Sequence, residues 1–150
     1  VGTIKGRQLK GQIENAADGS LNPDVSKWTG GWLFNFSGVT MDFDPYARTG
    51  SKASGVRVNG APLNPEADYS YASYWYAADP DLINVVPATN IRVIKDDNGS
   101  PLDGIEVVVR YLQSLPNHRA DPELGRIKLT RPLPAPISGS PEIQPLRGVE

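Results

Sequence analysis

The sequence predicts an α+β fold, namely a mixed β-sheet of short strands with a β-hairpin and two main helices. Three observations lead to this prediction: a helical spacing of apolar residues near the start, short alternating segments in the middle, and a second apolar stretch behind a helix-start signal near residue 100. The chain has 150 residues, which is enough for one domain with a hydrophobic core of its own.

The first expected element is a helix over residues 6–17. Its apolar residues recur at the spacing of one helical face, and they are Leu9, Ile13, Ala16 and Ala17. Gly19 follows, and glycine is common just beyond the last turn of a helix because it adopts the left-handed conformation without strain. The sequence therefore predicts that this helix stops at Gly19.

Several short strands are expected next. Residues 32–36 form an apolar run with strand character, and residues 39–44 alternate apolar and polar side chains, as a half-buried strand does. A strand over residues 53–58 leads into Asn59-Gly60. This dipeptide is a strong hairpin signal, because a type I′ turn needs positive φ at both central residues.

Three further strands are expected along the rest of the chain. Residues 69–76 are rich in aromatic side chains, which favour strands. Residues 90–94 form another strand, and residues 126–129 form the last one.

A second helix is expected after residue 100. Ser100 is suited to cap it, Pro101 suits the first helical position, and Asp103 stands where a capping-box acid belongs. Pro116 ends the helix. The expected buried stripe consists of Ile105, Val108, Val109 and Leu112.

The chain is expected to divide into one domain over residues 1–130 and a proline-rich tail over residues 131–150. The tail holds five prolines in 20 residues and shows no periodic apolar pattern, which is typical of a linker or of a segment docked irregularly on another surface. Residues 1–4 resemble the last part of a strand, so we expect the N-terminal part of the domain to precede them.

The composition excludes several classes of function. Hydrophobic residues make up 39% and charged residues 21%, as in globular proteins. The net charge is −2 and no run of Lys or Arg occurs, which argues against a nucleic-acid partner and against a basic membrane patch. No cysteine is present, so disulfides, thiolate catalysis and cysteine-based metal sites are excluded. No apolar stretch is long enough to span a membrane.

Few residues in the chain have the chemistry of a catalytic centre. His118 is the single histidine, and one imidazole without partners is expected to be a solvated loop residue rather than a metal ligand. Most paired carboxylates fall in strands or turns. The exception is Asp79-Pro80-Asp81, which follows the aromatic strand and could line a pocket. We therefore expect no catalytic residue and no metal ligand in this chain.

Aromatic side chains give the best candidates for binding. Large rings at strand ends beside glycine or Asp-Pro loops suit a binding rim, since a flat face stacks while a polar edge donates hydrogen bonds. The alternative, that these rings are ordinary core and surface residues, stays open. The candidate substrate-binding residues are Trp32, Leu33, Phe34, Asn35, Trp75, Tyr76, Asp79 and Asp81.

Four ordered motifs give the chain a resemblance to the C-terminal domain of the 5′-nucleotidases. Residues 5–10 (KGRQLK) resemble its strand-to-helix start, residues 30–38 (GGWLFNFSG) its "G-x-F-L-Q-V-S-G" strand, residues 58–65 (VNGAPLNP) its hairpin, and residues 125–128 (GRIK) its closing strand. Within that superfamily, residues 21–24 (LNPD) and the helix after Ser100 are most similar to the SoxB-type thiosulfohydrolases of sulfur oxidation.

The resemblance implies a two-domain, metal-dependent hydrolase that lies in the periplasm or outside the cell. Its N-terminal metallophosphatase domain would hold two metal ions, Mn or Zn, and would cleave phosphoester or sulfur–sulfonate bonds with metal-bound water. This chain would form one wall of the cleft, hold no cofactor itself, and contact a small-molecule or carrier-protein-bound substrate. Nucleotide catabolism and sulfur oxidation are the two pathways that the resemblance suggests.

One departure from the nucleotidase pattern favours the SoxB-like interpretation. Nucleotidases place one stacking ring in the "G-x-F-L" strand and another after a "G-G-D-G" loop. Here Trp32 or Leu33 takes the first position, and residues 77–82 (AADPDL) replace the second motif. A nucleobase sandwich is therefore not expected.

Two other interpretations stay open. The chain could be a non-enzymatic extracytoplasmic binding domain whose aromatic rim takes a peptide or a sugar. It could also be one fragment of a nicked enzyme that remains bound to its N-terminal half.

Overall fold

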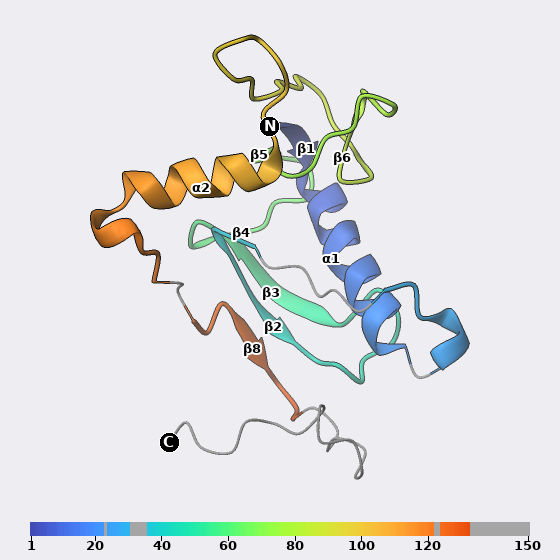
Figure 1. Ribbon diagram of the computed structural model, residues 1–150. Coiled ribbons are helices and arrows are strands. Elements are labelled where there is room, and N and C mark those ends of the chain that lie inside the picture. Colours follow the sequence, from blue (N-terminus) through green and yellow to red (C-terminus); the bar gives the residue numbers. More distant parts are fainter. Residues whose placement is uncertain (23, 31–35, 122–123, 133–150) are drawn as a thin grey trace.

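The computed structural model describes residues 1–22, 24–30, 36–121 and 124–132 (Figure 1). The predicted run over residues 32–36 therefore lies outside the described residues except for Phe36. The elements are β1 (Gly2–Lys5), α1 (Gly6–Leu21), η1 (Val25–Lys27), β2 (Val39–Phe43), β3 (Ala53–Val58), β4 (Ala61–Pro62), β5 (Asp68–Tyr71), β6 (Leu82–Ile83), β7 (Val86–Pro87), α2 (Gly104–Ser114), η2 (Pro116–His118) and β8 (Ile127–Leu129).

The strands form three small sheets. The largest has the order β4-β3-β2-β8, in which β2 pairs antiparallel with β3 and parallel with β8. Strand β1 pairs antiparallel with β5, and β6 pairs with β7 in a short hairpin. Two helices with mixed sheets of short strands confirm the predicted α+β fold class.

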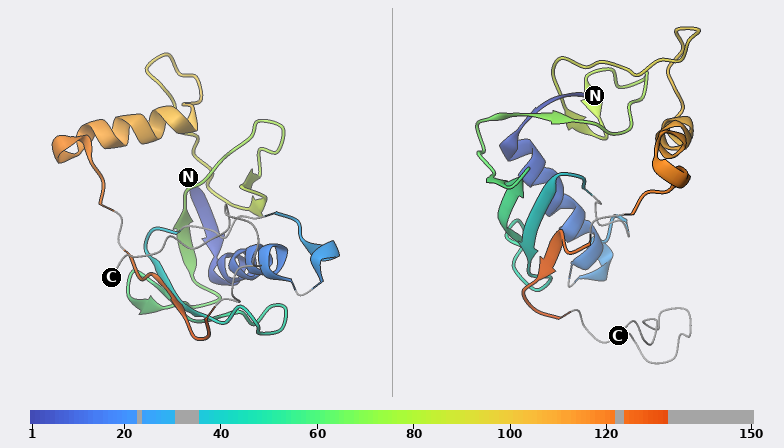
Figure 2. Two further views of the ribbon diagram at one scale, coloured as in Figure 1. Left: turned by 60° about the horizontal axis from the view of Figure 1, so that its bottom comes forward. Right: turned by 90° about the vertical axis from the view of Figure 1, so that its left-hand side faces the viewer.

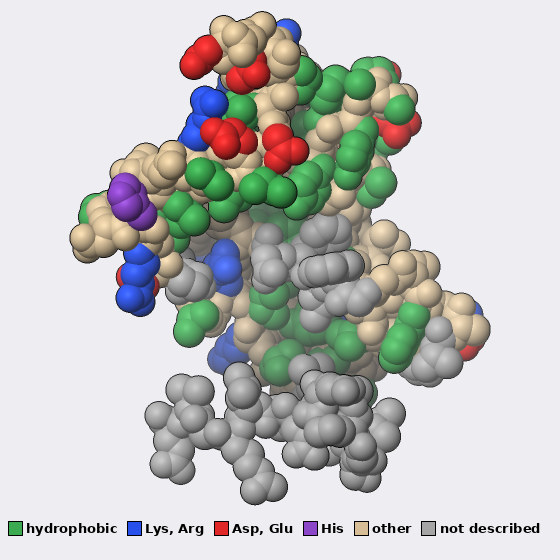
Figure 3. All heavy atoms as spheres, viewed as in Figure 1, with side chains coloured by type: hydrophobic (Ala, Val, Ile, Leu, Met, Phe, Trp, Pro, Cys, Tyr) green, Lys and Arg blue, Asp and Glu red, His purple; other side chains and the backbone are tan. Residues whose placement is uncertain are grey.

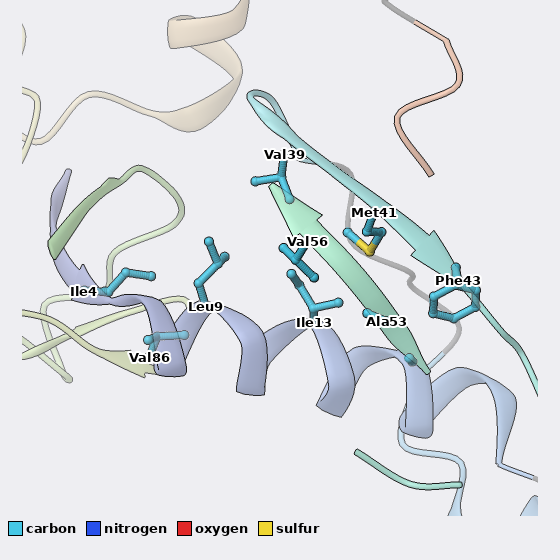
Figure 4. Close-up of a cluster of buried hydrophobic side chains, with 10 residues drawn as sticks. Ile4, Leu9, Ile13, Val39, Met41, Phe43, Ala53, Val56 and Val86 are labelled. Atoms are coloured by element: carbon cyan, nitrogen blue, oxygen red, sulfur yellow. The ribbon is translucent and has the colours of Figure 1, made fainter. Parts of the chain in front are cut away.

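Helix α1 packs on one face of strands β2 and β3, and the hydrophobic core fills the space between them (Figures 2 and 4). The core confirms the predicted stripe at Leu9, Ile13 and Ala17, and Ala16 is half-buried. The opposing strands contribute the apolar side of their alternation. The buried core residues are Ile4, Leu9, Ile13, Ala17, Val39, Met41, Phe43, Ala53, Val56 and Val86.

The strands with the clearest local signals form where the sequence predicts them. The predicted segments 39–44 and 53–58 are β2 and β3, and residues 126–129 contain β8. Asn59 and Gly60 have φ of 49° and 81°, as the predicted hairpin turn between β3 and β4 requires.

The predicted helix stop at Gly19 is wrong, because α1 continues to Leu21. Gly19 is buried in the last turn, where a Cβ atom would collide with the Oγ1 of Thr29. The Thr29 amide donates to the Gly19 carbonyl at 3.0 Å. Gly19 therefore permits a close contact with the following loop rather than ending the helix.

The predicted aromatic strand over residues 69–76 is shorter than expected. Strand β5 ends at Tyr71, which pairs with Gly2 at the end of β1. Residues 72–76 continue as a loop, in which the Tyr74 carbonyl accepts a 2.8 Å hydrogen bond from the Asn84 amide.

The predicted strand over residues 90–94 is wrong. Asn90 has a φ of 51°, which turns the chain. This segment meets the β1 side only through an isolated bridge between Thr3 and Thr89 and through backbone hydrogen bonds between Val1 and Arg92. The β6–β7 hairpin was not expected. Its turn places Asn84 and Val85 at φ of 46° and 61°, and a β-branched residue is rare in that conformation, so the sequence lacks the usual Asn-Gly hairpin signal there.

Two predictions about α2 are corrected. The helix begins three residues later than expected, since Asp103 is the N-cap and its side chain accepts a 2.8 Å hydrogen bond from the Ile105 amide. Ser100 instead accepts, through its carbonyl, a bond from the Asp96 amide. The predicted stripe is not buried: Ile105 is 77% exposed and Val108 is 55% exposed. The helix extends away from the sheet (Figure 1).

At the end of the described chain, Arg131 forms two hydrogen bonds to the carboxylate of Asp44, at 2.9 and 2.7 Å, and lies over the ring of Tyr46. Residues 133–150 lie outside the described residues, so the predicted boundary at residue 130 stays a prediction. No helix within the described residues has the length and apolar character needed to cross a membrane.

Candidate functional site

A cavity of about 310 Å³ opens where β1 and β5 meet the ends of β2 and β3. Five elements and three connecting segments line it, so the fold rather than any one segment creates it. The described lining residues are Ile4, Leu9, Phe36, Ser37, Val39, Val58, Asn59, Tyr69, Ser70, Tyr71, Ala72 and Ser73.

Some residues that line this cavity are direct neighbours, along the chain, of the two segments in which the sequence places the binding residues. Phe36 and Ser37 directly follow the first candidate segment, and Ser73 directly precedes the aromatic loop of the second. The first segment, Trp32, Leu33, Phe34 and Asn35, lies outside the described residues. The cavity is therefore the described feature nearest to both candidate segments along the chain.

The second candidate segment forms a closed loop beside the cavity. The indole of Trp75 donates a 3.2 Å hydrogen bond to the Pro80 carbonyl, and the Asp79 amide donates to the Tyr76 carbonyl at 3.0 Å. Trp75 is half-buried, whereas Tyr76 is 61% exposed. None of Trp75, Tyr76, Asp79 and Asp81 is among the described lining residues, so their part in binding stays a prediction.

Arg126 holds the Phe36 side of the cavity in place. Its guanidinium donates to the Phe36 carbonyl, and its own carbonyl accepts a 2.9 Å bond from the Met41 amide. Gly125, with φ of 80°, makes the turn that brings Arg126 to this position. The closing G-R-I-K motif thus supports the strand that leaves the first candidate segment.

The turn after β4 caps the start of α1. The amides of Gly6 and Arg7 donate to the carbonyls of Ala67 and Pro65, at 3.0 and 2.9 Å. Gly6 is required because a Cβ atom there would collide with the Asn64 carbonyl. The first and third sequence motifs therefore meet in space, since the turn satisfies amides that a helix start leaves free.

Tyr69 links this turn to the cavity. Its hydroxyl accepts a 2.9 Å hydrogen bond from the Asn64 amide, and its ring lies close to Gly6. On the other side, the Asn59 amide donates to the Gly38 carbonyl at 2.8 Å, which joins the β3–β4 turn to the entrance of β2. Sequence reasoning did not select Tyr69 or Asn59 as site residues, although Asn59 lies within the hairpin motif and Tyr69 follows it by four residues.

The described lining combines apolar side chains with uncharged polar groups. Serine hydroxyls and the Asn59 amide can donate or accept hydrogen bonds, and Ile4, Leu9 and Val39 supply apolar surface. None of the described lining residues carries a formal charge at neutral pH. Such a lining suits the uncharged part of a ligand, because an ionised group would lose its hydration without gaining a counter-charge.

The described residues do not assemble a metal centre. No group of three or more His, Cys, Asp or Glu side chains comes together within the described ranges. Among the acids, Asp44 is engaged by Arg131, whose hydrogen bonds hold the pKa of the Asp44 carboxyl below its ordinary value. His118 is exposed in η2.

A buried charge network joins α1 to the start of β3, and sequence reasoning missed it. The Glu14 carboxylate, 6% exposed as a residue, accepts hydrogen bonds at 2.9 Å from the amides of Lys52 and Ala53 and a further bond from Lys10. Lys52, 2% exposed, donates to the carbonyls of Pro45 and Ala47.

This network shifts the titration of Glu14. Burial raises the pKa of the Glu14 carboxyl, but the hydrogen bonds from Lys10 and the two amides outweigh it, so the pKa lies below its ordinary value. Asp18 completes the network, 3.6 Å from the Lys52 ammonium. The spacing of Lys10, Glu14 and Asp18 along one helical face is the sequence signal that could have revealed it.

The comparisons with known proteins agree with the fold and the motifs. The family described as "5′-nucleotidase, C-terminal domain" matches residues 1–86. Among solved structures, the sulfate thiohydrolase SoxB of Thermus thermophilus in complex with glycerol is similar, with 27% sequence identity and a TM-score of 0.64. That match covers 86% of this chain and 22% of the SoxB chain.

The chain therefore spans less than a quarter of that relative. No curated protein sequence matches this chain. The family match nevertheless covers more than half of this chain and contains all the described residues that line the cavity. The chain belongs to the 5′-nucleotidase C-terminal domain family.

Proposed function

We propose that this chain is the substrate-binding C-terminal domain of a longer, extracytoplasmic metal-dependent hydrolase of the SoxB and 5′-nucleotidase type, and that it is not catalytic alone. The observation that carries the proposal is the cavity, whose described lining residues all fall within the family match and adjoin both candidate binding segments along the chain. Its uncharged lining suits substrate contact rather than bond cleavage. Cleavage would take place at a two-metal centre of the N-terminal domain.

Two observations favour a sulfur-containing substrate over a nucleotide. The similar solved structure is a sulfate thiohydrolase. In this chain, the loop that carries a stacking ring in nucleotidases is replaced by residues 77–82, which the Trp75–Pro80 hydrogen bond closes. We propose that the cavity takes the uncharged portion of a thiosulfonate-type small molecule or of a carrier-protein segment.

The division of labour is tested by comparing turnover of the 150-residue chain with that of the complete gene product. Both are incubated with thiosulfonate-type substrates and with nucleotides in the presence of manganese. We expect the complete product to hydrolyse the sulfur substrate and the 150-residue chain to hydrolyse neither. Turnover by the purified 150-residue chain would refute the proposal.

The cavity itself is tested with a matched pair of variants in the complete product. Ser73→Phe fills the cavity with a bulky ring, and Ser51→Phe introduces the same ring at an exposed position that is not among the described lining residues. We expect Ser73→Phe to raise KM about ten-fold or more with a small effect on kcat, since it removes binding without touching the cleavage centre. Equal KM values for the two variants would contradict a role for the cavity.

A second function is favoured by one observation. Tyr74 and Tyr76 are 65% and 61% exposed on the aromatic loop, which suits a non-enzymatic binding domain that stacks a sugar or a peptide. The complete gene product separates the two functions, because an N-terminal part without metal-binding motifs would favour the binding domain.

A further inference from the structure

Helix α2 exposes an apolar surface that the described residues of its domain do not bury. Ile105, Val108 and Tyr111 are 77%, 55% and 57% exposed, and no residue of this helix is buried. Figure 3 shows a band of hydrophobic side chains along α2. A contiguous apolar surface of this kind marks an interaction site.

The apolar surface of α2 is wide enough for the helix to pack against two neighbours. At about 100° per residue, the apolar side chains from Val107 round to Val109 span about 200° of the helix circumference, with the polar side chains confined to the rest. A helix that packs on a single domain needs an apolar stripe about 100° wide. One side of α2 can face its own domain, and the other side remains for a second body.

The surface continues from α2 onto the aromatic loop. The ring of Tyr74 lies against the start of the helix, where a Cβ atom on Gly104 would be 3.4 Å from the ring. Tyr74 and Tyr76 are themselves exposed. We define the α2 surface as Tyr74, Tyr76, Ile105, Val108 and Tyr111.

Acidic groups border this surface. Asp96 and Asp97 are close enough to Arg110 to raise the pKa of its guanidinium, after the larger effect of its hydrogen bond to Glu106. Asp103 caps the helix at the same end. A complementary partner would have an apolar face bordered by basic side chains.

We propose that the α2 surface docks against the remaining, N-terminal part of the complete gene product, through an apolar face of that part with a basic border. This inference rests on the proposed function. The similar SoxB chain is more than four times as long as the region it shares with this chain, so a second body large enough to cover the surface is present in that relative. Docking here would fix the orientation of the cavity relative to the rest of the enzyme.

Hydroxyl-radical footprinting tests the docking, with two tyrosines of similar exposure as probe and control. Tyr111 lies on the α2 surface, whereas Tyr46, 49% exposed, lies beside Arg131 at the far end of β2. In the 150-residue chain we expect both rings to be oxidised readily. In the complete gene product, oxidation of Tyr111 should fall about five-fold or more, because the centre of an interface excludes water, while Tyr46 stays unchanged.

A variant makes the assignment specific. Val108→Asp in the complete product should restore the oxidation of Tyr111 to its level in the 150-residue chain, whereas Leu124→Asp, at an 87% exposed position outside the surface, should leave Tyr111 protected. Because α2 contributes nothing to the buried core, Val108→Asp is expected to leave the unfolding midpoint of the 150-residue chain unchanged.

Three outcomes would overturn the docking proposal. The first is equal oxidation of Tyr111 in the 150-residue chain and the complete product. The second is protection of Tyr111 in a monomeric 150-residue chain, which would mean that residues 133–150 cover the surface. The third is protection in a dimeric 150-residue chain by sedimentation, which would mean that a second copy does. Footprinting does not depend on turnover. The oxidation of Tyr111 therefore tests the docking, while the turnover assays test the proposed function separately.

Discussion

Of the two helices of this domain, the more apolar one is exposed and the less apolar one packs in the core. In α2, six of the eleven residues are apolar, yet none of them is buried. In α1, only five of the sixteen residues are Ala, Leu or Ile, yet this helix forms one side of the core. The apolar content of a helix therefore does not decide whether it is buried. What decides it is whether a neighbour lies against its apolar face.

Helix α1 is also anchored by polar interactions that α2 lacks. The Gln8 side chain accepts from the Lys5 amide at 2.7 Å and donates to the Pro87 carbonyl at 2.8 Å, while Glu14 binds the start of β3. On α2, the pair of Glu106 and Arg110 is exposed and stays within the helix. The first helix is thus part of the framework of the fold, whereas the second presents a surface.

The largest contrast is expected from one substitution made in both helices. Ile13→Ala opens a cavity in the core and should lower the free energy of unfolding of the 150-residue chain by about 3 kcal/mol. Ile105→Ala removes an exposed side chain and should change it by less than about 0.5 kcal/mol. Urea denaturation followed by fluorescence measures both. Similar losses from the two variants would show that α2 is buried within the isolated chain.

The second contrast concerns the acidic residues of the two helices. Glu14→Gln replaces a carboxylate that accepts hydrogen bonds from two backbone amides. We expect it to lower the free energy of unfolding by about 2 kcal/mol at pH 7. Glu106→Gln removes only the exposed pair with Arg110 and should cost less than about 0.5 kcal/mol. The unfolding free energies of both variants against the unchanged chain provide the measurement.

The same contrast appears in the dependence of stability on pH. The pKa of Glu14 is lowered in the folded chain. Its contribution to the stability of the fold is therefore fully present at pH values above its ordinary pKa of 4.5, and it is lost as the pH falls through the folded pKa. Glu14→Gln should therefore flatten the loss of stability below pH 4.5, and Glu106→Gln should not. A Glu14→Gln profile as steep as that of the unchanged chain would contradict the shift.

Sequence signals predicted those elements whose shape is set within a few residues. The alternation in residues 39–44 and the dipeptide Asn59-Gly60 have local causes, and both predictions are confirmed. The strand predictions failed where a distant partner decides the outcome, as at Tyr71, where the pairing with β1 ends. Gly19 shows a related limit, since its role depends on Thr29 from the following loop.

The candidate site was only partly predictable for the same reason. The motifs indicated which segments approach the cavity, but Asn59, Tyr69 and Ser73 come from separate parts of the chain, and only the fold brings them together. The buried charges of Glu14 and Lys52 were not predicted, because charged residues are expected at the surface unless their binding partners in the fold are known. The exposed stripe of α2 was predicted as buried because the periodicity of a helix does not show which body covers it.

The smallest effect is expected at the start of α2. Asp103→Ala removes the hydrogen bond that caps the helix, a loss worth about 1 kcal/mol to helix formation. An eleven-residue helix without tertiary packing is marginal in water, so this loss should appear as local fraying rather than as global unfolding. Hydrogen exchange should accelerate in residues 104–114 of the 150-residue chain while the urea midpoint stays unchanged. Asp103→Asn, which keeps a capping oxygen, should restore slow exchange.

If the docking on α2 is correct, the complete gene product should suppress the acceleration of exchange in Asp103→Ala, because contact with a second body stabilises the helix that has lost its cap.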